Sequence, residues 1–166
     1  MEGKGSSGPR SLDLVETLSS GSGFWTGDGI NHQNQTFHAL LLVRRLFGAQ
    51  PALLWFKAAG DGGVVYHEEV SLFGPGMDGS LTMVSANTNI PFVQEFGSSA
   101  RGGAFDFHHG DHSRHDTFRE IVSFDLISTG EVRLTFKWGM PGEVVSDRSS
   151  AKLTRSNAPP SDAPIR

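Results

Sequence analysis

The sequence predicts an all-β domain: a single antiparallel up-and-down β-barrel of about nine or ten strands with one short N-terminal helix. Short runs of strand-forming residues follow one another closely, with turn residues and no helical pattern between them. Glycine accounts for 21 of the 166 residues and phenylalanine for 12, which suits many turns around an aromatic core. A closed barrel also pairs the edges that so many short strands would otherwise leave exposed.

The two ends of the chain predict segments outside the core. Residues 1–10 are rich in Gly and Ser and residues 156–166 are rich in Pro, and neither has an apolar pattern, so we expect both to be disordered. One barrel domain then spans 11–155. Ser11–Leu18 predicts its short helix, because Ser11 can cap the first turn and three apolar residues fall near one face.

Most of the domain has the pattern of strands separated by turns. Glu131–Trp138 alternates most clearly, with apolar side chains facing one way and polar side chains the other. Thr88–Ser99 has no clear pattern, and there we expect either a strand or a short helix over the mouth of the barrel. The other predicted strands are Phe24–Ile30, Thr36–Phe47, Pro51–Ala58, Val64–Phe73, Ser80–Asn87, Gly103–His109, Thr117–Ser128 and Ser146–Arg155.

The composition of the chain disfavours several classes of protein. The net charge is −4 and there is no basic stripe, so we expect no nucleic-acid partner. The chain has no Cys, which excludes disulfides and thiolate chemistry and is typical of cytoplasmic proteins. No apolar run is long enough to span a membrane, and no stretch resembles a secretory signal. We therefore expect a cytoplasmic protein.

Val64–Phe73 places three consecutive ionisable residues in the middle of an apolar strand. Because neighbouring side chains of a strand point to opposite faces, Glu68 shares a face with Tyr66, and His67 shares the other with Glu69. The face of Tyr66 is slightly the more apolar, so we expect Glu68 inside the barrel. His67 and Glu69 would then lie nearer to solvent.

Glu120 is the clearest single candidate for a functional side chain. It shares one strand face with four apolar residues: Phe118, Val122, Phe124 and Leu126. This predicts that Glu120 points into the barrel, where it needs an Arg, a His or a ligand as partner. The alternative is that it lies close to the strand end and reaches water. We predict that Glu68 and Glu120 form the internal polar site, with His67 as a further catalytic candidate.

Aromatic side chains on the predicted inner faces suit a cavity for an apolar or aromatic molecule. Trp25 is an exception, because we expect it to plug the closed end of the barrel. The predicted ligand-binding residues are Tyr66, Trp55, Phe118, Phe124, Phe136, Trp138 and His38.

His38 lies in a strand that is rich in Leu on both faces, Thr36–Phe47. The face opposite His38 is fully apolar, which predicts that His38 is on the wetter side. The short helix or the second subunit of a homodimer could cover that outer face.

The stretch from His108 to His115, with the sequence HHGDHSRH, could in principle bind a transition metal. Its spacing matches no established zinc pattern, and the chain has no Cys. Gly110 and the polar setting favour a solvated hairpin loop, so we predict no metal site.

An early Phe24-Trp25-x-Gly27-x-Gly29, one short helix before it and a strand meander that ends near Ala151-x-Leu153-x-Arg155 resemble the calycin β-barrels. The closest resemblance is to bacterial fatty-acid-binding-protein-like and nitrobindin-like haem-binding proteins, over Leu18–Arg155. It implies a lipocalin-like barrel around a cavity for an apolar small molecule. Nitrobindin-like members hold haem through a His on a late strand. Ser146–Arg155 has no His, so the resemblance carries over the barrel and not the haem.

These candidates lead to two classes of function. The first is binding of a small hydrophobic or aromatic molecule, oriented by buried carboxylates and without a cofactor. The second is an isomerase, cyclase or dehydratase that uses a buried Glu as general acid or base, with a His or a Tyr as its partner, on a hydrophobic substrate. Haem binding through His38 or His67 is the least favoured hypothesis, because the late-strand His is missing.

Overall fold

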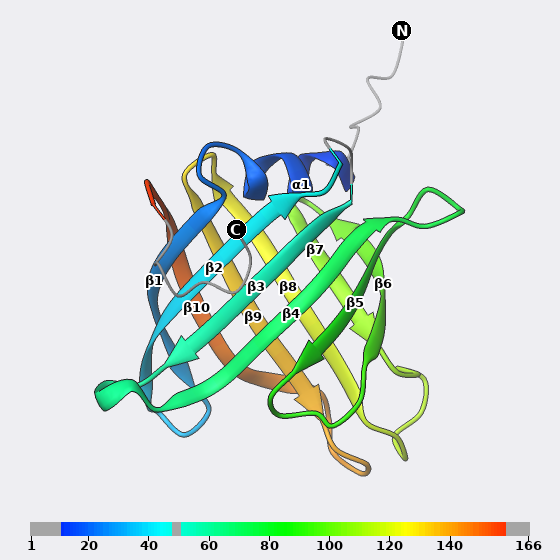
Figure 1. Ribbon diagram of the computed structural model, residues 1–166. Helices are drawn as coiled ribbons and strands as arrows, with labels where there is room; N and C mark the ends of the chain where they lie inside the picture. The colour runs from blue at the N-terminus through cyan, green and yellow to red at the C-terminus, as the bar shows by residue number, and fades with distance from the viewer. Residues whose placement is uncertain (1–10, 48–50, 159–166) are drawn as a thin grey trace, which may run out of the picture.

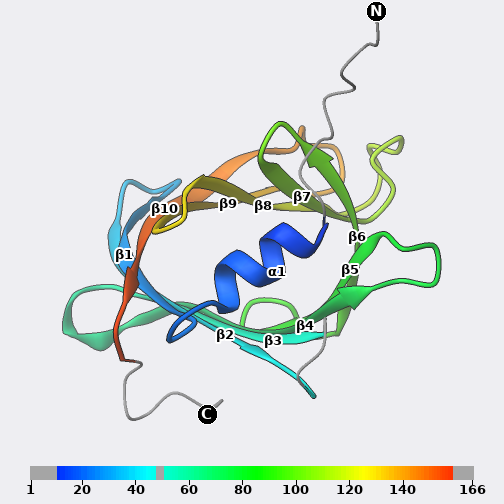
Figure 2. The same ribbon diagram turned by 90° about the horizontal axis from the view of Figure 1, so that it is seen from above.

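The computed structural model describes residues 11–47 and 51–158, and within them ten antiparallel strands close into a barrel (Figure 1). One α-helix, α1 (Ser11–Ser19), lies across one end of this barrel (Figure 2). The strands are β1 (Phe24–Asn31), β2 (Thr36–Arg45), β3 (Ala52–Ala59), β4 (Val65–Pro75), β5 (Leu81–Asn87), β6 (Gln94–Arg101), β7 (Ala104–His109), β8 (Arg119–Ser128), β9 (Glu131–Gly139) and β10 (Ser146–Ser156). The predicted all-β barrel with a short N-terminal helix is confirmed.

Two predictions concern the ends of the chain and the membrane. The disorder expected for residues 1–10 and for the tail beyond 158 lies outside the described residues. None of the helices in the described part of the chain is long and apolar enough to cross a membrane.

The strands form an up-and-down meander that β1 closes by pairing with β10. In the closing register Trp25 lies opposite Arg155, and Gly29 lies opposite Ala151. The two sequence patterns that resemble the calycins therefore face each other across the seam where the barrel closes.

The segment Thr88–Ser99 divides into a loop over 88–93 and the first part of β6. The Asn87 side chain marks the end of β5, because its Oδ1 accepts the backbone N–H groups of Asn89 at 2.9 Å and Ile90 at 3.0 Å. This loop lies at the end of the barrel opposite α1 (Figure 1).

Alternation along the strands sends one set of apolar side chains into the barrel, as predicted for β2, β8 and β9. These inner residues join one buried cluster: Phe37, Ala39, Leu41, Val43, Val122, Phe124, Val132 and Leu134. Leu14, Val15 and Leu18 of α1 belong to the same cluster. The helix therefore seals its end of the barrel with apolar contacts.

Trp25 completes this closed end. Its side chain is fully buried, and its Nε1 donates a hydrogen bond to the carbonyl oxygen of Leu18 at 2.8 Å. The guanidinium of Arg155 lies over the indole, 4.5 Å from the ring centroid. The prediction that Trp25 plugs the closed end is confirmed.

A second apolar cluster lies on the outside of the barrel. Leu42 of β2 packs there with Phe24 of β1 and Trp55 of β3, its direct partners across the two neighbouring strands. The apolar outer face of β2 thus has partners within the chain, whereas α1 lies across the barrel end. The homodimer that this face suggested stays a prediction.

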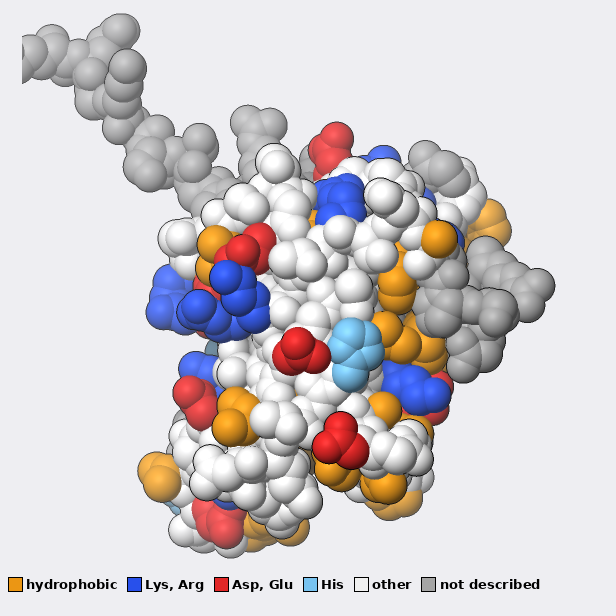
Figure 3. All heavy atoms as spheres, turned by 90° about the vertical axis from the view of Figure 1, so that its left-hand side faces the viewer, with side chains coloured by type: hydrophobic (Ala, Val, Ile, Leu, Met, Phe, Trp, Pro, Cys, Tyr) orange, Lys and Arg blue, Asp and Glu red, His pale blue; other side chains and the backbone are white. Residues whose placement is uncertain are grey.

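The surface around β1 and β10 carries Lys and Arg side chains interspersed with Asp and Glu (Figure 3). No extended field of one sign forms on this face. The expectation that the protein has no nucleic-acid partner stays a prediction.

Candidate functional site

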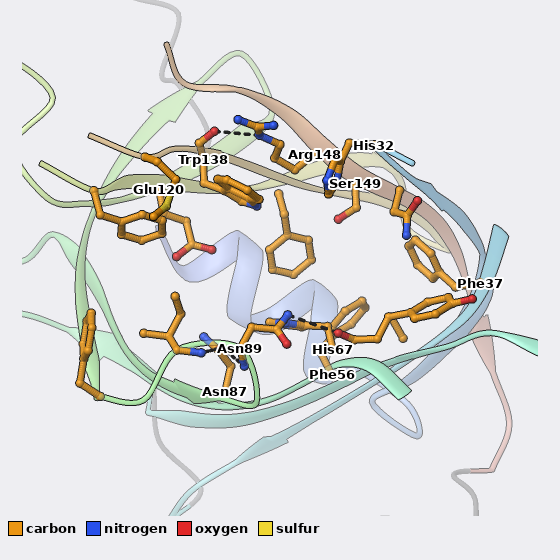
Figure 4. A pocket seen from close by; sticks show the side chains of 18 residues that line it. His32, Phe37, Phe56, His67, Asn87, Asn89, Glu120, Trp138, Arg148 and Ser149 are labelled. Atoms are coloured by element: carbon orange, nitrogen blue, oxygen red, sulfur yellow. Dashed lines mark hydrogen bonds between the residues drawn. The ribbon is translucent and has the colours of Figure 1, made fainter. Parts of the chain in front are cut away.

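The half of the barrel opposite α1 encloses a cavity of about 510 Å³ (Figure 4). α1 lies behind it in this view, so the cavity opens at the other end. Its walls are mainly aromatic, with a few polar groups. The lining residues are Asn31, His32, Phe37, Phe56, Ala58, Tyr66, His67, Asn87, Asn89, Ile90, Phe92, Phe118, Glu120, Phe136, Trp138, Met140, Arg148 and Ser149.

A β-bulge at the start of β4 brings two neighbouring side chains to this cavity. Ala58 pairs with His67 and Ala59 pairs with Val65, so Tyr66 is the extra residue between them. The bulge interrupts the strict alternation of the strand. Tyr66 and His67 therefore both line the cavity.

Beyond the bulge, β4 turns the opposite face inward from the one we predicted. Glu69 and Ser71 are 5% and 0% exposed, whereas Val70 and Leu72 remain 39% and 46% exposed on the outside. The prediction that Glu68 is inside and Glu69 near solvent is wrong. The inner polar groups find hydrogen-bond partners within the barrel, which outweighs the slightly greater apolarity of the other face.

Glu68 and Trp55 lie together on the outer side of the barrel wall, where Trp55 is buried. Trp55 Nε1 donates a hydrogen bond to Glu68 Oε1 at 2.8 Å. Neither residue lines the cavity, so their predicted placement in the internal site is wrong. The internal carboxyl pair is Glu69 and Glu120, rather than Glu68 and Glu120.

His38 is also outside, on the wetter side that its strand pattern predicted. Its Nε2 lies 2.9 Å from Thr26 Oγ1 and its Nδ1 lies 3.2 Å from Asp28 Oδ1, and the side chain is 56% exposed. His38 is therefore not a contact of a molecule in the cavity.

Glu69 is a buried carboxylate held by two neighbours on its own strand. His67 Nε2 lies 3.2 Å from its Oε2, and the Ser71 hydroxyl donates to its Oε1. Burial alone would raise the pKa of Glu69, but the hydrogen bonds from His67 and Ser71 hold it below its ordinary value. Glu69 is therefore ionised at neutral pH.

His67 links this carboxylate to the cavity. Its side chain is 17% exposed, and its Nδ1 lies 3.0 Å from the amide nitrogen of Asn89, in the loop over the mouth. With the amide nitrogen donating to Nδ1, the ring proton is on Nε2 and donates to Glu69. Both ring nitrogens thus have protein partners.

Glu120 points into the cavity from β8, which confirms its predicted orientation (Figure 4). The residue is 7% exposed, and its Oε2 accepts a hydrogen bond from Gln94 Nε2 at 2.8 Å. Asn87 Nδ2 in turn donates to Gln94 Oε1 at 3.0 Å. Burial raises the pKa of Glu120, with a further contribution from the negative charge of Glu69. Relative to an ordinary Glu, the surroundings of Glu120 thus favour the protonated carboxyl, and those of Glu69 favour the ionised one.

The aromatic walls agree with most of the predicted ligand contacts. Phe118, Phe136 and Trp138 line the cavity, as does Tyr66. Phe124 faces inward but packs edge-on against Phe107 in the core, with ring centroids 5.9 Å apart, and it does not line the cavity.

Phe37 lines the cavity because Gly29 leaves room for its ring. A Cβ atom on Gly29 would lie 2.3 Å from Phe37 Cζ. We expect Gly29→Ala to push this ring into the cavity and weaken ligand binding. Binding of 1-naphthalenemethanol to the variant, measured by titration calorimetry beside its thermal unfolding, checks this. Unchanged affinity in a folded variant would contradict it.

The rim carries polar residues that the sequence did not single out. The Arg148 guanidinium lies 4.0 Å from the centroid of the Trp138 ring, and His32 meets the same ring edge-on at 5.9 Å. Arg148 also donates to Glu143 Oε2 at 2.8 Å. No local pattern distinguishes His32 or Arg148 from surface residues; only the closure of the barrel places them together.

Haem would need a histidine ligand in this cavity. Of its two histidines, His67 has partners on both ring nitrogens, and His32 stands at the rim against Trp138. Axial ligation needs a ring nitrogen that faces the iron. β10 offers no His. His67 is therefore not a ready ligand for haem iron.

The His-rich stretch begins on β7 and continues into the following loop. His108 Nε2 lies 3.0 Å from Ser99 Oγ, and the ring of His112 meets that of His108 edge-on at 5.2 Å. Within the described residues, no group of three or more His, Asp or Glu side chains could hold a metal ion. The absence of a metal site stays a prediction.

No family model and no curated protein sequence matches this chain. The crystal structure of Rv2717c from M. tuberculosis is similar, with a TM-score of 0.60 and 14% identity over 87% of this chain and 96% of that chain. EF1p2_mFAP2b bound to DFHBI (TM-score 0.46, 10% identity, 88% and 100% covered) and the redesigned beta barrel b11L5F_LGL (0.40, 11%, 89% and 99%) are also similar. At these identities the likeness concerns the barrel fold alone.

Proposed function

We propose that the barrel binds one small molecule with an apolar or aromatic body and a polar end, as calycin-type barrels do. The observation that carries the proposal is a cavity of about 510 Å³ with aromatic walls and a few convergent polar groups. Small-molecule sites usually have this size and composition. The rings would hold the body of the ligand, and Glu120 and Asn89 would orient its polar end.

Three tryptophans in different places allow a direct test. Trp138 lines the cavity, Trp25 lies in the closed end, and Trp55 lies on the outside. We expect 1-naphthalenemethanol to bind saturably by titration calorimetry and to change tryptophan fluorescence. Trp138→Phe should abolish the fluorescence change, whereas Trp55→Phe, the matched control, should retain it.

Native mass spectrometry of the purified protein provides a second test without a chosen probe. A retained small molecule that is lost on partial unfolding would support the proposal. A protein that carries no molecule and binds no naphthalene probe would count against it. So would a fluorescence change that persists in Trp138→Phe.

A proton-transfer enzyme is the second candidate, and the pair of His67 and Glu69 is the observation that favours it. A buried carboxylate that orients a histidine is typical of catalytic bases. Glu120 would supply the acid, since its environment favours the protonated form. A substrate would have to displace Asn89 to reach His67 Nδ1, which makes binding the better supported function.

Exchange of carbon-bound protons tests this candidate. The base would remove a proton from the carbon next to a carbonyl, and the same carbon would regain a deuteron from solvent. We expect an enzyme of this kind to accelerate exchange of 2-tetralone in deuterated water, followed by NMR, and His67→Gln to remove the acceleration. Exchange at the buffer rate with the wild-type protein would contradict it.

A further inference from the structure

The cavity wall carries one carboxyl group, Glu120, and one arginine, Arg148. Glu69 does not line the cavity, but its negative charge acts on Glu120, and its own surroundings favour its ionised form. Arg148 also lines the cavity, but it is bonded to Glu143 at 2.8 Å and to the carbonyl oxygen of Trp138 at 3.1 Å. The negative charge of Glu69 therefore disfavours a second anion at Glu120.

One carboxyl oxygen of Glu120 is available to a ligand. Its Oε2 accepts the hydrogen bond from Gln94, which is neutral and is itself held by Asn87. Within the described part of the chain, Oε1 has no hydrogen-bond partner and the carboxyl has no ion-pair partner. The residue is 7% exposed and points into the cavity (Figure 4). A buried carboxyl normally has a positively charged partner or a full set of hydrogen bonds, and Glu120 has neither within the described residues.

Aromatic rings surround the same space. Trp138 lies directly opposite Glu120 on the neighbouring strand, and Phe118 precedes Glu120 on the same strand face. Phe56 and Phe136 form part of the wall near His67, with ring centroids 5.4 Å apart. The faces of such rings attract cations and also provide apolar contact.

We propose that the ligand of this cavity is a small hydrophobic amine, bound as its ammonium ion with Glu120 as counter-ion. This inference rests on the proposed binding function. The Glu120 proton passes to solvent when an ammonium ion enters, or to the amine when the free base enters. Both routes end in an ammonium carboxylate pair. A ligand with a carboxylate end would instead meet the charge of Glu69 and find no free cation.

The pH dependence of affinity separates an amine from a neutral ligand. The unliganded Glu120 carboxyl stays protonated above its ordinary range, because burial raises its pKa. An ammonium ion selects the ionised form, so its affinity rises with pH through this titration, until the amine itself loses its proton above about pH 9–10. An uncharged ligand that accepts a hydrogen bond binds the protonated Glu120 carboxyl instead. The affinity of such a ligand therefore falls as the pH rises over the same range.

Other groups near the cavity could also impose a pH trend. The titratable or charged side chains that face this space are Glu69, His67, Tyr66, His109, His32 and Arg148. Protonation of a histidine would repel an ammonium ion and produce a trend of the same sign. A trend due to the histidines persists in Glu120→Gln, whereas a trend due to Glu120 disappears.

Three probes with one ring system test the proposal by titration calorimetry between about pH 5 and 8: 1-naphthylmethylamine, 1-naphthalenemethanol and 1-naphthoate. We expect the amine to bind about 10- to 100-fold more tightly than the alcohol near pH 8, and the carboxylate most weakly. Glu120→Gln should weaken amine binding by a similar factor and alcohol binding much less, because a Gln side chain still forms hydrogen bonds with a hydroxyl but cannot act as a counter-ion. Glu95→Gln, an exposed carboxyl on β6, should change neither.

The results with the three probes separate a failure of the amine proposal from a failure of the proposed binding function. Tight binding of the alcohol or the carboxylate without a preference for the amine overturns the inference and leaves the binding function in place. Failure of all three probes to bind counts against both. Equal amine affinity in the wild type and Glu120→Gln also overturns the inference. The pH dependence of the wild-type protein tests it without any variant.

Discussion

Glu69→Gln is expected to lower the stability of the protein at pH 7 by about 2–4 kcal/mol, whereas Glu120→Gln is expected to raise it. Both carboxyl groups are buried in the same part of the barrel, at 5% and 7% exposure. Glu69 is an anion between His67 and Ser71, and a Gln amide cannot accept from both as well as the carboxylate does. Glu120 prefers its proton, so a Gln resembles its favoured form.

The pH dependence of the two effects has opposite sign. The pKa of Glu69 is held below its ordinary value of 4.5, so its contribution is present above about pH 4.5 and is lost as the pH falls through the folded-state pKa. The pKa of Glu120 is raised above 4.5, so the folded state keeps a proton that the unfolded state releases. Wild-type stability is therefore lost as the pH rises through that window.

Urea unfolding of the wild type and both variants from about pH 4 to 8 measures these effects. The loss caused by Glu69→Gln should shrink toward acid pH. The gain caused by Glu120→Gln should vanish near pH 4.5 and grow above it. The exposed Glu95→Gln serves as control and should follow the wild type at every pH. An equal loss of stability in Glu69→Gln and Glu120→Gln would show that the surroundings do not shift the two carboxyl pKa values in opposite directions.

The barrel was predictable because its main signals lie within single strands. In Glu131–Trp138 the alternation alone identifies the core face, and the buried Val132 and Leu134 follow it. Two sequence patterns far apart in the chain, one near Trp25 and one near Arg155, lie on the two strands that close the barrel. Trp25 of the first lies opposite Arg155 of the second across the seam. The sequence shows each pattern, but only the register shows that they are partners.

The site was predictable only where the strand itself defines the environment. Glu120 could be placed inward because its neighbours on the same face are apolar. Glu69 could not, because its environment depends on Tyr66, which the bulge adds to the strand, and on partners that the fold arranges. One local signal was available: His67 and Glu69 lie two residues apart, which places them on one strand face.

The polar groups that hold the site together come from other strands and from the loop at the mouth. Gln94 reaches Glu120 from β6, and Asn89 reaches His67 from the segment that was ambiguous between strand and helix. Neither contact has a signature in the sequence, because each joins residues more than 20 positions apart. Only the structure shows these contacts.

Arg155→Ala is expected to lower the stability of the protein by about 2–4 kcal/mol, or roughly 5–12 °C in Tm, although Arg155 is outside the apolar core. Its guanidinium donates to the carbonyl oxygens of Thr17 at 3.1 Å and Ser20 at 2.6 Å, and to that of Thr129 at 2.6 Å. The carbonyls of Thr17 and Ser20 lie at the C-terminal end of α1, where the helix dipole favours a cation. The guanidinium also stacks on Trp25.

One side chain thus joins the helix, the indole that plugs the barrel and the turn between β8 and β9. Arg155→Lys keeps the positive charge but lacks the planar set of N–H donors that lets a guanidinium reach several carbonyl oxygens at once. We therefore expect its loss of stability to be more than half of that of Arg155→Ala. Arg133→Ala, an exposed arginine on β9, should change stability by less than about 0.5 kcal/mol. Thermal unfolding of these three variants checks the expectation. If Arg155→Lys were as stable as the wild type, charge alone, and not the planar set of donors, would hold the helix on the barrel.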